Sequence, residues 1–179
     1  MLQDIREVLI SKEAIEAKTK ELAERISRDY KGKDLLVVGV LKGSVIFASE
    51  LIKNITIPCE IDFMAVSSYG SFSETTGVVR ILKDLDSEIS GKHILIVEDI
   101  VDSGVTLSYL LNYLKTRNAS SVEIASLLTK PSRRKVDIDC KYIGFETPDE
   151  FLVGYGLDYA EKYRNLPFIG ILKREVYEK

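Results

Sequence analysis

One junction constrains the fold of this chain more than any other segment. The run His93 to Val97 is apolar and β-branched, which is typical of a buried strand. Two acids, Glu98 and Asp99, come next, and a short polar loop then leads into leucines spaced as on one face of a helix. These leucines are Leu107, Leu110, Leu111 and Leu114. The segment is therefore predicted to pass from a strand, through a tight loop, into the start of a helix.

The loop has the composition of an anion-binding site. The free N–H groups and the dipole at a helix start both favour a phosphate. Gly104 would let the backbone approach a ligand closely, and Ser103 and Thr106 add hydroxyl donors. The two preceding acids could accept hydrogen bonds from sugar hydroxyls or hold a metal, so the pattern favours a phosphorylated ribose. The alternative is a plain strand–helix junction in which Asp102 or Ser103 caps the helix.

The run Val97-Glu-Asp-Ile-Val-Asp-Ser-Gly-Val-Thr106 resembles the phosphoribosyl-pyrophosphate (PRPP) motif of the type I phosphoribosyltransferases. Its acids resemble those of the hypoxanthine-guanine branch. The resemblance implies that PRPP is bound by Glu98, Asp99, Asp102, Ser103, Gly104, Val105 and Thr106. It also implies that Asp102 is the catalytic residue, acting as general base or hydrogen-bond acceptor at N7 of a purine.

Three further segments resemble PRPP-binding parts of this family. Lys42 and Gly43 follow an apolar strand and would contact pyrophosphate, in a loop that often has a cis peptide, here between Leu41 and Lys42. Arg164 matches a family arginine that contacts pyrophosphate. Ser68 and Tyr69 open a polar loop that resembles the family's lid over PRPP. The alternatives are a lysine-bearing turn, a surface arginine and an ordinary surface loop.

The segment Phe151-Leu-Val-Gly-Tyr-Gly-Leu-Asp-Tyr159 resembles the purine-binding segment of the same family. Phe151 would stack on the base, backbone groups near Leu152 would read its edge, and Asp158 would hold Mg²⁺. Lys130 matches the lysine that contacts the exocyclic oxygen of a 6-oxopurine. The resemblance thus gives a purine-binding set of Lys130, Phe151, Leu152 and Asp158, and a metal-binding set of Asp158, Glu98 and Asp99. A dinucleotide fingerprint is a weak alternative, because Tyr159 stands where the third glycine belongs.

The periodicity of the chain predicts alternating helices and strands. Helices are expected at 11–30 and 45–52, and strands at 35–40, 61–66, 78–82, 93–97, 122–128, 142–145, 151–153 and 168–172, with a loop at 67–76. This order favours an α/β fold in one domain, residues 1–179, with a parallel sheet core and helices on both faces. The resemblance to the type I phosphoribosyltransferase fold adds a small purine-recognising hood.

Composition narrows the classes of function. The net charge of −3 argues against nucleic-acid or membrane binding, and the run Arg133-Arg134-Lys135 is expected to be a solvated face. Two distant cysteines and a charged N-terminus favour a reducing, cytoplasmic location. The one histidine, His93, leaves little material for histidine triads or zinc sites, and no Gly-x-x-x-x-Gly-Lys-Ser/Thr element suggests an ATP-binding loop.

The resemblance implies a purine-salvage transferase whose partners are PRPP and a 6-oxopurine base, with Mg²⁺ as cofactor and a homodimer or homotetramer as the assembly. Two rivals remain. One is the same fold acting on another base such as xanthine, because Lys130 and Phe151 would fit either 6-oxopurine. The other is an RNA-binding regulator built on this fold, similar to the pyrimidine attenuation proteins, which the acidic charge disfavours.

Overall fold

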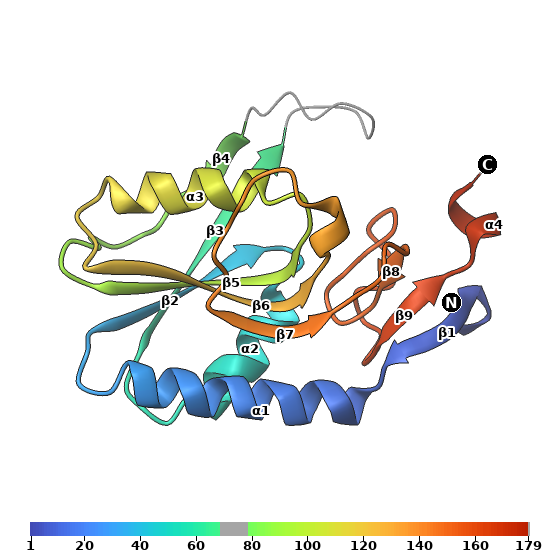
Figure 1. Cartoon of the computed structure of the whole chain (residues 1–179), viewed down its shortest axis with the longest axis horizontal. Helices are drawn as coiled ribbons and strands as arrows, with labels where there is room; N and C mark the ends of the chain where they lie inside the picture. Colours follow the sequence, from blue (N-terminus) through green and yellow to red (C-terminus); the bar gives the residue numbers. More distant parts are fainter. Residues whose placement is uncertain (69–78, 179) are drawn as a thin grey trace.

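A six-stranded sheet forms the centre of the computed structural model, which describes residues 1–68 and 79–178 (Figure 1). The strand order is β4-β3-β2-β5-β6-β7. The strands are β2 (Leu35–Leu41), β3 (Glu60–Ser68), β4 (Val79–Lys83), β5 (His93–Val101), β6 (Ser121–Thr129) and β7 (Tyr142–Glu146). All neighbouring pairs are parallel except β3 and β4, which are antiparallel. This confirms the predicted sheet and adds an antiparallel edge to it.

Helices cover both faces of this sheet, as predicted. They are α1 (Lys12–Asp29), α2 (Val45–Asn54) and α3 (Val105–Lys115). The side chains of β2 alternate between the two faces, as strand geometry requires. Leu35 and Val37 belong to the core formed with α1 and α2, whereas Leu36 and Val38 belong to the core formed with α3. Burying an aliphatic side chain of this size contributes about 1.5–3 kcal/mol, so both faces hold the sheet in place.

Local signals set the ends of α1. Ser11 is its N-cap and accepts a hydrogen bond from the Ala14 N–H at 3.2 Å. The apolar stripe of the helix, Ile15, Leu22 and Ile26, is fully buried. Beyond the C-cap, Gly32 has a φ of +76°, a left-handed conformation that glycine adopts readily. The helix predicted at 11–30 is thus confirmed within one residue at each end.

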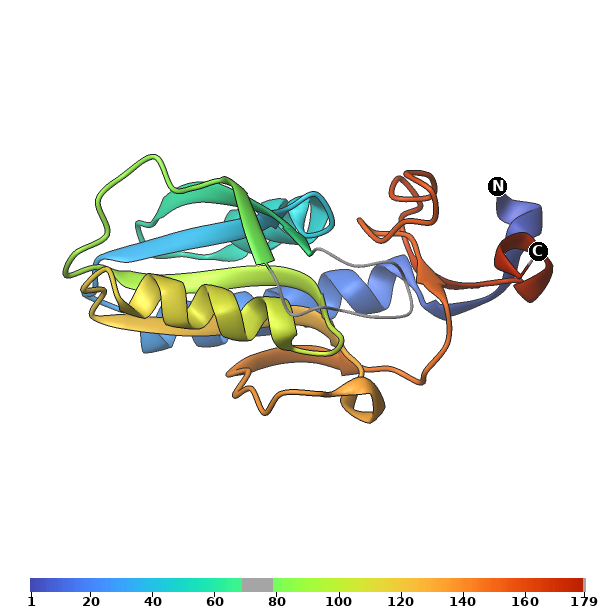
Figure 2. The same cartoon turned by 90° about the horizontal axis from the view of Figure 1, so that it is seen from above.

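A second, smaller sheet carries the purine segment. It has the order β1-β9-β8, all antiparallel, from β1 (Ile5–Ile10), β8 (Leu152–Val153) and β9 (Ile169–Leu172). Figures 1 and 2 place it beyond the end of the large sheet at which α3 begins. This small sheet of β1, β9 and β8 is called the hood below. Two short helices flank it at the two ends of the chain, η1 (Leu2–Asp4) and α4 (Arg174–Tyr177). A third short helix, η2 (Pro131–Arg133), follows β6.

Three details differ from the sequence prediction. β1 was not expected, because Ile5-Arg-Glu-Val-Leu-Ile10 mixes charged and apolar residues and gains its place by pairing with β9. β5 continues through the acids to Val101, so the acids lie within the strand. Ser67 and Ser68 end β3 instead of opening a loop, and the rest of the predicted lid segment, Tyr69 included, lies outside the described residues.

Two further observations concern the described residues as a whole. Cys59 and Cys140 are both free. Across residues 1–68 and 79–178, no helix is both long enough and apolar enough to cross a membrane.

Candidate active site

The loop between β5 and α3 forms the first part of the site. Gly104 is the N-cap of α3, with a φ of +84°, and its carbonyl accepts the first helical hydrogen bond from Ser108 at 2.9 Å. Ser103 Oγ accepts a hydrogen bond from the Val105 N–H at 3.4 Å. A cavity of about 180 Å³ opens here and is lined by Glu98, Asp99, Ile100, Asp102, Ser103, Gly104, Thr106 and Leu107. Six of the seven motif residues predicted to bind PRPP, all but Val105, therefore surround one space at a helix start, a place that favours a phosphate.

The chain that follows β6 supports this loop. The backbone N–H groups of Lys135 and Val136 donate to the carbonyl of Ser103, at 2.9 and 3.3 Å. A Cβ atom at Gly104 would lie 3.1 Å from the carbonyl oxygen of Val136, which is tighter than ordinary contact. A larger residue at this position would therefore clash as well as strain the left-handed backbone.

The two acids on β5 lie in a partly dry environment. Burial raises the pKa of Asp99 to about 6, and the nearby charge of Asp158 also raises it, while Arg164 opposes the shift. Burial and the neighbouring Asp99 raise the pKa of Glu98 well above its ordinary value. The ionised form of such a buried carboxylate is stabilised by hydrogen-bond donors or by a cation. Sugar hydroxyls would supply the donors, and a metal would supply the cation.

A second cavity, of about 470 Å³, adjoins the first. It is lined by Ile100, Asp102, Lys130, Arg133, Asp149, Glu150, Phe151, Leu152, Leu157, Asp158, Arg174 and Tyr177. All four predicted purine-binding residues are in this set, and Asp102 and Ile100 line both cavities. The structure thus brings the two predicted halves of the site side by side, with Asp102 at the boundary.

Lys130 is the buried cation of this second cavity. Only 7% of it is exposed, and its Nζ donates a hydrogen bond to the carbonyl of Glu150 at 2.6 Å. Burial lowers the pKa of its ammonium, although Asp102 and Asp149 oppose the shift. The remaining Nζ donors can serve a ligand that presents an acceptor.

Aromatic rings form another wall of the second cavity. Tyr177 of α4 stacks on Phe151, with ring centroids 4.7 Å apart and planes at 26°. Tyr159 meets the same ring edge-on at 5.5 Å. Sequence reasoning missed Tyr177, because a short terminal helix after a strand carries no motif of its own.

The basic run after β6 is exposed at Arg133 and Lys135 and half-buried at Arg134, so it is largely the solvated face that its composition predicted, but its arginines also make specific contacts. Arg133 Nε lies 3.0 Å from Asp102 Oδ1, and Arg133 Nη1 donates to Asp149 at 3.3 Å. Arg134 donates to the Thr129 hydroxyl at 2.7 Å. The turn of η2 returns the chain toward the motif loop, and charge balance along the sequence gives no sign of this. Arg133 is therefore a second missed site residue, which forms an ion pair with Asp102.

The loop after β2 closes the far side of the site. Its Leu41–Lys42 peptide bond is cis, as the resemblance implied. A Cβ atom at Gly43 would collide with the Asp99 carboxylate, and one at Gly156 would collide with the Gly43 carbonyl. These two contacts are close enough to require glycine, and they join the β2 loop to β5 and to the purine segment.

The remaining predicted residues meet in an ion-pair network. Arg164 contacts Asp158 Oδ1 at 2.9 Å and donates to the carbonyl of Gly156 at 2.7 Å. The carboxylate of Glu161 contacts both Lys42 Nζ, at 2.7 Å, and Arg164 Nη2, at 3.2 Å. Lys42 and Arg164, which the sequence assigned to one anion, therefore meet at one carboxylate. Ser68 is the last residue of β3 and is distant in the sequence from the residues of this network. Tyr69 lies outside the described residues.

The predicted metal ligands do not form a ready-made cage. Among residues 1–68 and 79–178, no three histidine, cysteine or acidic side chains converge as a metal-binding group. Glu98, Asp99 and Asp158 were predicted as one set, and the structure does not join them as such. Their hard carboxylate oxygens suit Mg²⁺, which commonly binds one or two carboxylates together with substrate oxygens.

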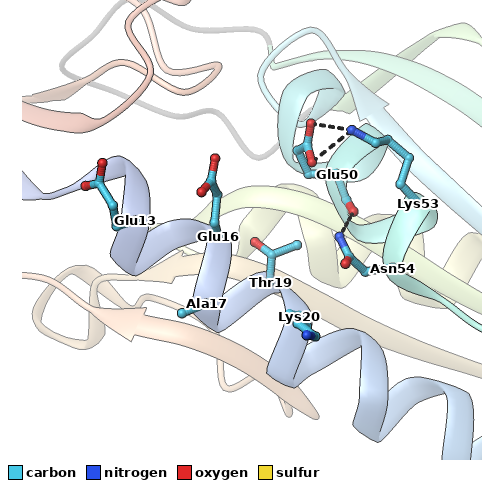
Figure 3. Close-up of a pocket in the computed structure, with 8 residues that line it drawn as sticks. All are labelled: Glu13, Glu16, Ala17, Thr19, Lys20, Glu50, Lys53 and Asn54. Atoms are coloured by element: carbon cyan, nitrogen blue, oxygen red, sulfur yellow. Dashed lines mark hydrogen bonds and ion pairs between the residues drawn. The ribbon is translucent and has the colours of Figure 1, made fainter.

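Another cavity, of about 520 Å³, lies between α1 and α2, away from these residues (Figure 3). Glu13, Glu16 and Lys20 line it from α1, and Glu50 and Lys53 from α2. Lys53 is hydrogen-bonded to Glu50 at 3.0 Å, and the Asn54 side chain donates to the backbone of Glu50 at 2.8 Å. The cavity is a groove between charged helix surfaces and contains none of the predicted site residues.

Comparison with known proteins agrees with this geometry. The model of the phosphoribosyl transferase domain family matches residues 8–160. The chain is 54% identical to the hypoxanthine-guanine phosphoribosyltransferase of Bacillus subtilis (strain 168) over 178 residues, which are 99% of each protein. It is 52% identical over 177 residues to the enzyme of the same name from Streptococcus thermophilus (strain CNRZ 1066), with 99% of this chain and 98% of the relative covered.

Solved structures give the same result. A crystal structure of a hypoxanthine phosphoribosyltransferase from Staphylococcus aureus covers 100% of this chain and 97% of its own, with a TM-score of 0.97 and 53% identity. The fold and the site thus define a phosphoribosyltransferase. The chain belongs to the phosphoribosyltransferase family, and within it to the branch of the hypoxanthine-guanine phosphoribosyltransferases.

Proposed function

We propose that the chain transfers the 5-phosphoribosyl group of PRPP to N9 of hypoxanthine or guanine, giving IMP or GMP and pyrophosphate, as a step of purine salvage. One observation carries the proposal. Asp102 lines both the cavity at the start of α3 and the cavity that contains Lys130 and Phe151. A reaction that joins a phosphorylated ribose to a base requires two such spaces with a polar group between them.

On the ribose side, the 5′-phosphate lies against the backbone of residues 103–106 and the hydroxyls of Ser103 and Thr106. Glu98 and Asp99 accept hydrogen bonds from the ribose hydroxyls. Lys42, Gly43 and Arg164 bind the pyrophosphate, and Ser68 and Tyr69 are assigned to PRPP by the family resemblance of their segment alone. The convergence of Lys42 and Arg164 on one carboxylate supports this part, because the same two cations can hold an anionic ligand.

On the base side, the purine lies against the face of Phe151. Lys130 donates to its 6-oxo group, and backbone groups near Leu152 read the ring edge. Lys130 suits an acceptor because an ammonium has only donors. Its burial supports a role in discrimination, because an unmatched donor in a dry pocket is costly.

The chemistry depends on Asp102. Its carboxylate accepts the proton, or a hydrogen bond, at N7 of the purine. This makes N9 more electron-rich as it attacks the anomeric carbon, while the bond from that carbon to pyrophosphate breaks. Arg133, 3.0 Å from Asp102 Oδ1, forms an ion pair with this carboxylate and would favour its ionised, proton-accepting form.

Mg²⁺ is the proposed cofactor. Asp158 would hold it together with oxygens of PRPP, and Glu98 and Asp99 contribute negative charge nearby. When bound, the ion would orient the leaving pyrophosphate and neutralise its developing charge. The fit rests on the carboxylates, because the charge of Asp158 raises the pKa of Asp99, and a bound cation would offset that repulsion.

The partners proposed are PRPP and a 6-oxopurine, without nucleic acid or membrane. A homodimer or homotetramer and a cytoplasmic location remain predictions. The rival hypothesis is that xanthine is the preferred base, and it is tested by comparing the rates with a panel of bases. An RNA-binding role is tested by a gel-shift assay against cellular RNA, and we expect no shift.

The reaction is tested by measuring pyrophosphate and nucleotide together. With PRPP, magnesium and hypoxanthine, both products should appear in equal amounts, and omission of either substrate should abolish both. Pyrophosphate released without base would indicate hydrolysis of PRPP, and no release under any condition would contradict the proposed function.

A further inference from the structure

Glu161 occupies the meeting point of two cations that the proposed function assigns to pyrophosphate. One of its carboxylate oxygens lies 2.7 Å from Lys42 Nζ, and the other lies 3.2 Å from Arg164 Nη2. Lys42 lies in the loop after β2, whereas Arg164 belongs to the segment after the purine-binding residues. A single carboxylate therefore bridges two distant parts of the chain, as one phosphoryl group of pyrophosphate would.

The backbone presents Glu161 at an unusual turn. Ala160 and Glu161 have φ values of +50° and +63°, and the residues on either side, Tyr159 and Lys162, exchange two backbone hydrogen bonds. These features define a tight turn of the type that glycine and asparagine normally fill. Residues other than glycine adopt this left-handed conformation only rarely. The Glu161 N–H also donates to Asp158 Oδ2 at 2.9 Å, which ties the turn to the site.

The side chain of Arg164 and the backbone of Lys42 do not depend on Glu161 for their positions. Arg164 is held by the carbonyl of Gly156 and by Asp158. Lys42 adjoins Gly43, whose carbonyl is in close contact with Gly156. The backbone frame of the anion site therefore exists without the Glu161 side chain, which is 64% exposed and free to turn away.

We propose that Glu161 competes with pyrophosphate for Lys42 and Arg164. Its carboxylate neutralises the two cations when the site is empty, gives way to the pyrophosphate group of PRPP, and returns when pyrophosphate leaves. The residue thereby lowers affinity for the product and limits product inhibition. This inference rests on the proposed function, because it takes Lys42 and Arg164 as the pyrophosphate-binding cations.

The test measures binding of magnesium pyrophosphate by titration calorimetry to the wild type and to Glu161→Gln. Glutamine keeps the size of the side chain and the backbone N–H but removes the charge. Because exposed ion pairs contribute little, we expect binding to tighten by about 2–5-fold, with a difference that shrinks as salt rises. Inhibition of the forward reaction by added pyrophosphate should strengthen by the same factor.

Two further variants make the result decisive. Glu60→Gln breaks an equally short ion pair, with Lys92 at 2.6 Å, at the start of β3, and it should leave pyrophosphate binding unchanged. Lys42→Met should weaken binding. If Lys42→Met weakens binding but Glu161→Gln binds pyrophosphate no more tightly than the wild type, the competition is wrong and the proposed function stands. If Lys42→Met binds as the wild type does, the assignment of Lys42 is wrong and the inference falls with it.

Discussion

Asp102 is the residue on which the two substrates would meet. It belongs to the walls of both cavities, and its carboxylate forms an ion pair with Arg133 at 3.0 Å. Lys130 lies in the wall of the second cavity and holds the carbonyl of Glu150. Each of these side chains has a separate chemical task, so single substitutions should separate the reaction step from the choice of base.

Asp102→Asn should lower kcat by about 10²–10⁴-fold, the usual range for a general acid–base group. The amide keeps the size of the side chain but cannot accept the N7 proton. PRPP affinity, measured by calorimetry, should change much less. Asp137→Asn, an exposed aspartate in the segment that supports the loop, is the matched control. Turnover within a few-fold of the wild type would mean that Asp102 only shapes the loop.

Lys130→Met should lower kcat/KM for hypoxanthine and for guanine by about 10–100-fold, because a hydrogen bond from a charged donor contributes about 1.5–3 kcal/mol. The gap between these bases and adenine should narrow. Lys115→Met, at the exposed end of α3, serves as the control. An unchanged ratio of guanine to adenine would show that another group reads position 6.

At the scale of elements, the antiparallel edge formed by β3 and β4 is held by a buried acid. Asp62 is 7% exposed, and its carboxylate accepts hydrogen bonds from the N–H groups of Asp86 and Phe63, at 2.8 and 2.7 Å, and from Lys83 Nζ at 3.3 Å. Burial by itself raises the pKa of Asp62, but these donors outweigh it and lower the pKa below the ordinary value. The ionised form therefore stabilises the fold.

Asp62→Asn should reduce the free energy of unfolding by about 1–3 kcal/mol at neutral pH, because buried donors lose their charged acceptor. A lowered pKa in the folded state means that this stabilisation is present above the ordinary pKa of 3.8 and is lost as pH falls through the folded-state value. The difference between variant and wild type, measured by urea unfolding, should therefore shrink at acidic pH. Asp34→Asn, an exposed aspartate, should show little change, and a loss for Asp62→Asn that stays constant with pH would contradict the assigned role of the charge.

Periodicity predicted the elements well where one face of a strand or helix is buried. The run at 35–40 and the stripe of Ile15, Leu22 and Ile26 carry their own signal. β1 carries none, because its place depends on pairing with β9 at the other end of the chain. Arg133 and Tyr177 were missed for the same reason, since tertiary folding brings them to the site. Motif resemblance supplied the other site residues, because local spacing preserves a loop that binds its ligand with backbone groups.

At the scale of the molecule, the two sheets carry the two segments proposed to bind the two substrates. The large sheet carries the PRPP motif at the end of β5, and the hood carries the purine segment on and after β8 (Figure 2). Close contacts of Gly43 with Asp99 and with Gly156 connect the two parts. The carboxylates and the anion-binding cations gather at this connection, which is where a leaving pyrophosphate and its metal would lie.

Removal of divalent cations should therefore abolish activity, and added Mg²⁺ should restore it. Asp158→Asn should raise the magnesium concentration needed for half-maximal rate, because a carboxylate ligand is lost. Full activity after chelation would contradict the magnesium part of the mechanism.

The central claim is that the buried donor in the second cavity selects a 6-oxopurine. The most direct test measures kcat/KM of the wild type with PRPP and each of hypoxanthine, guanine, xanthine and adenine. Adenine presents a donor at position 6 to the donors of Lys130, and sites built on such matching reject the wrong group by about 10⁴–10⁵-fold. We predict efficient use of hypoxanthine and guanine and negligible use of adenine. Equal kcat/KM values for adenine and guanine would contradict this selection by Lys130. A higher kcat/KM for xanthine than for the other bases would support the rival hypothesis that xanthine is the preferred base.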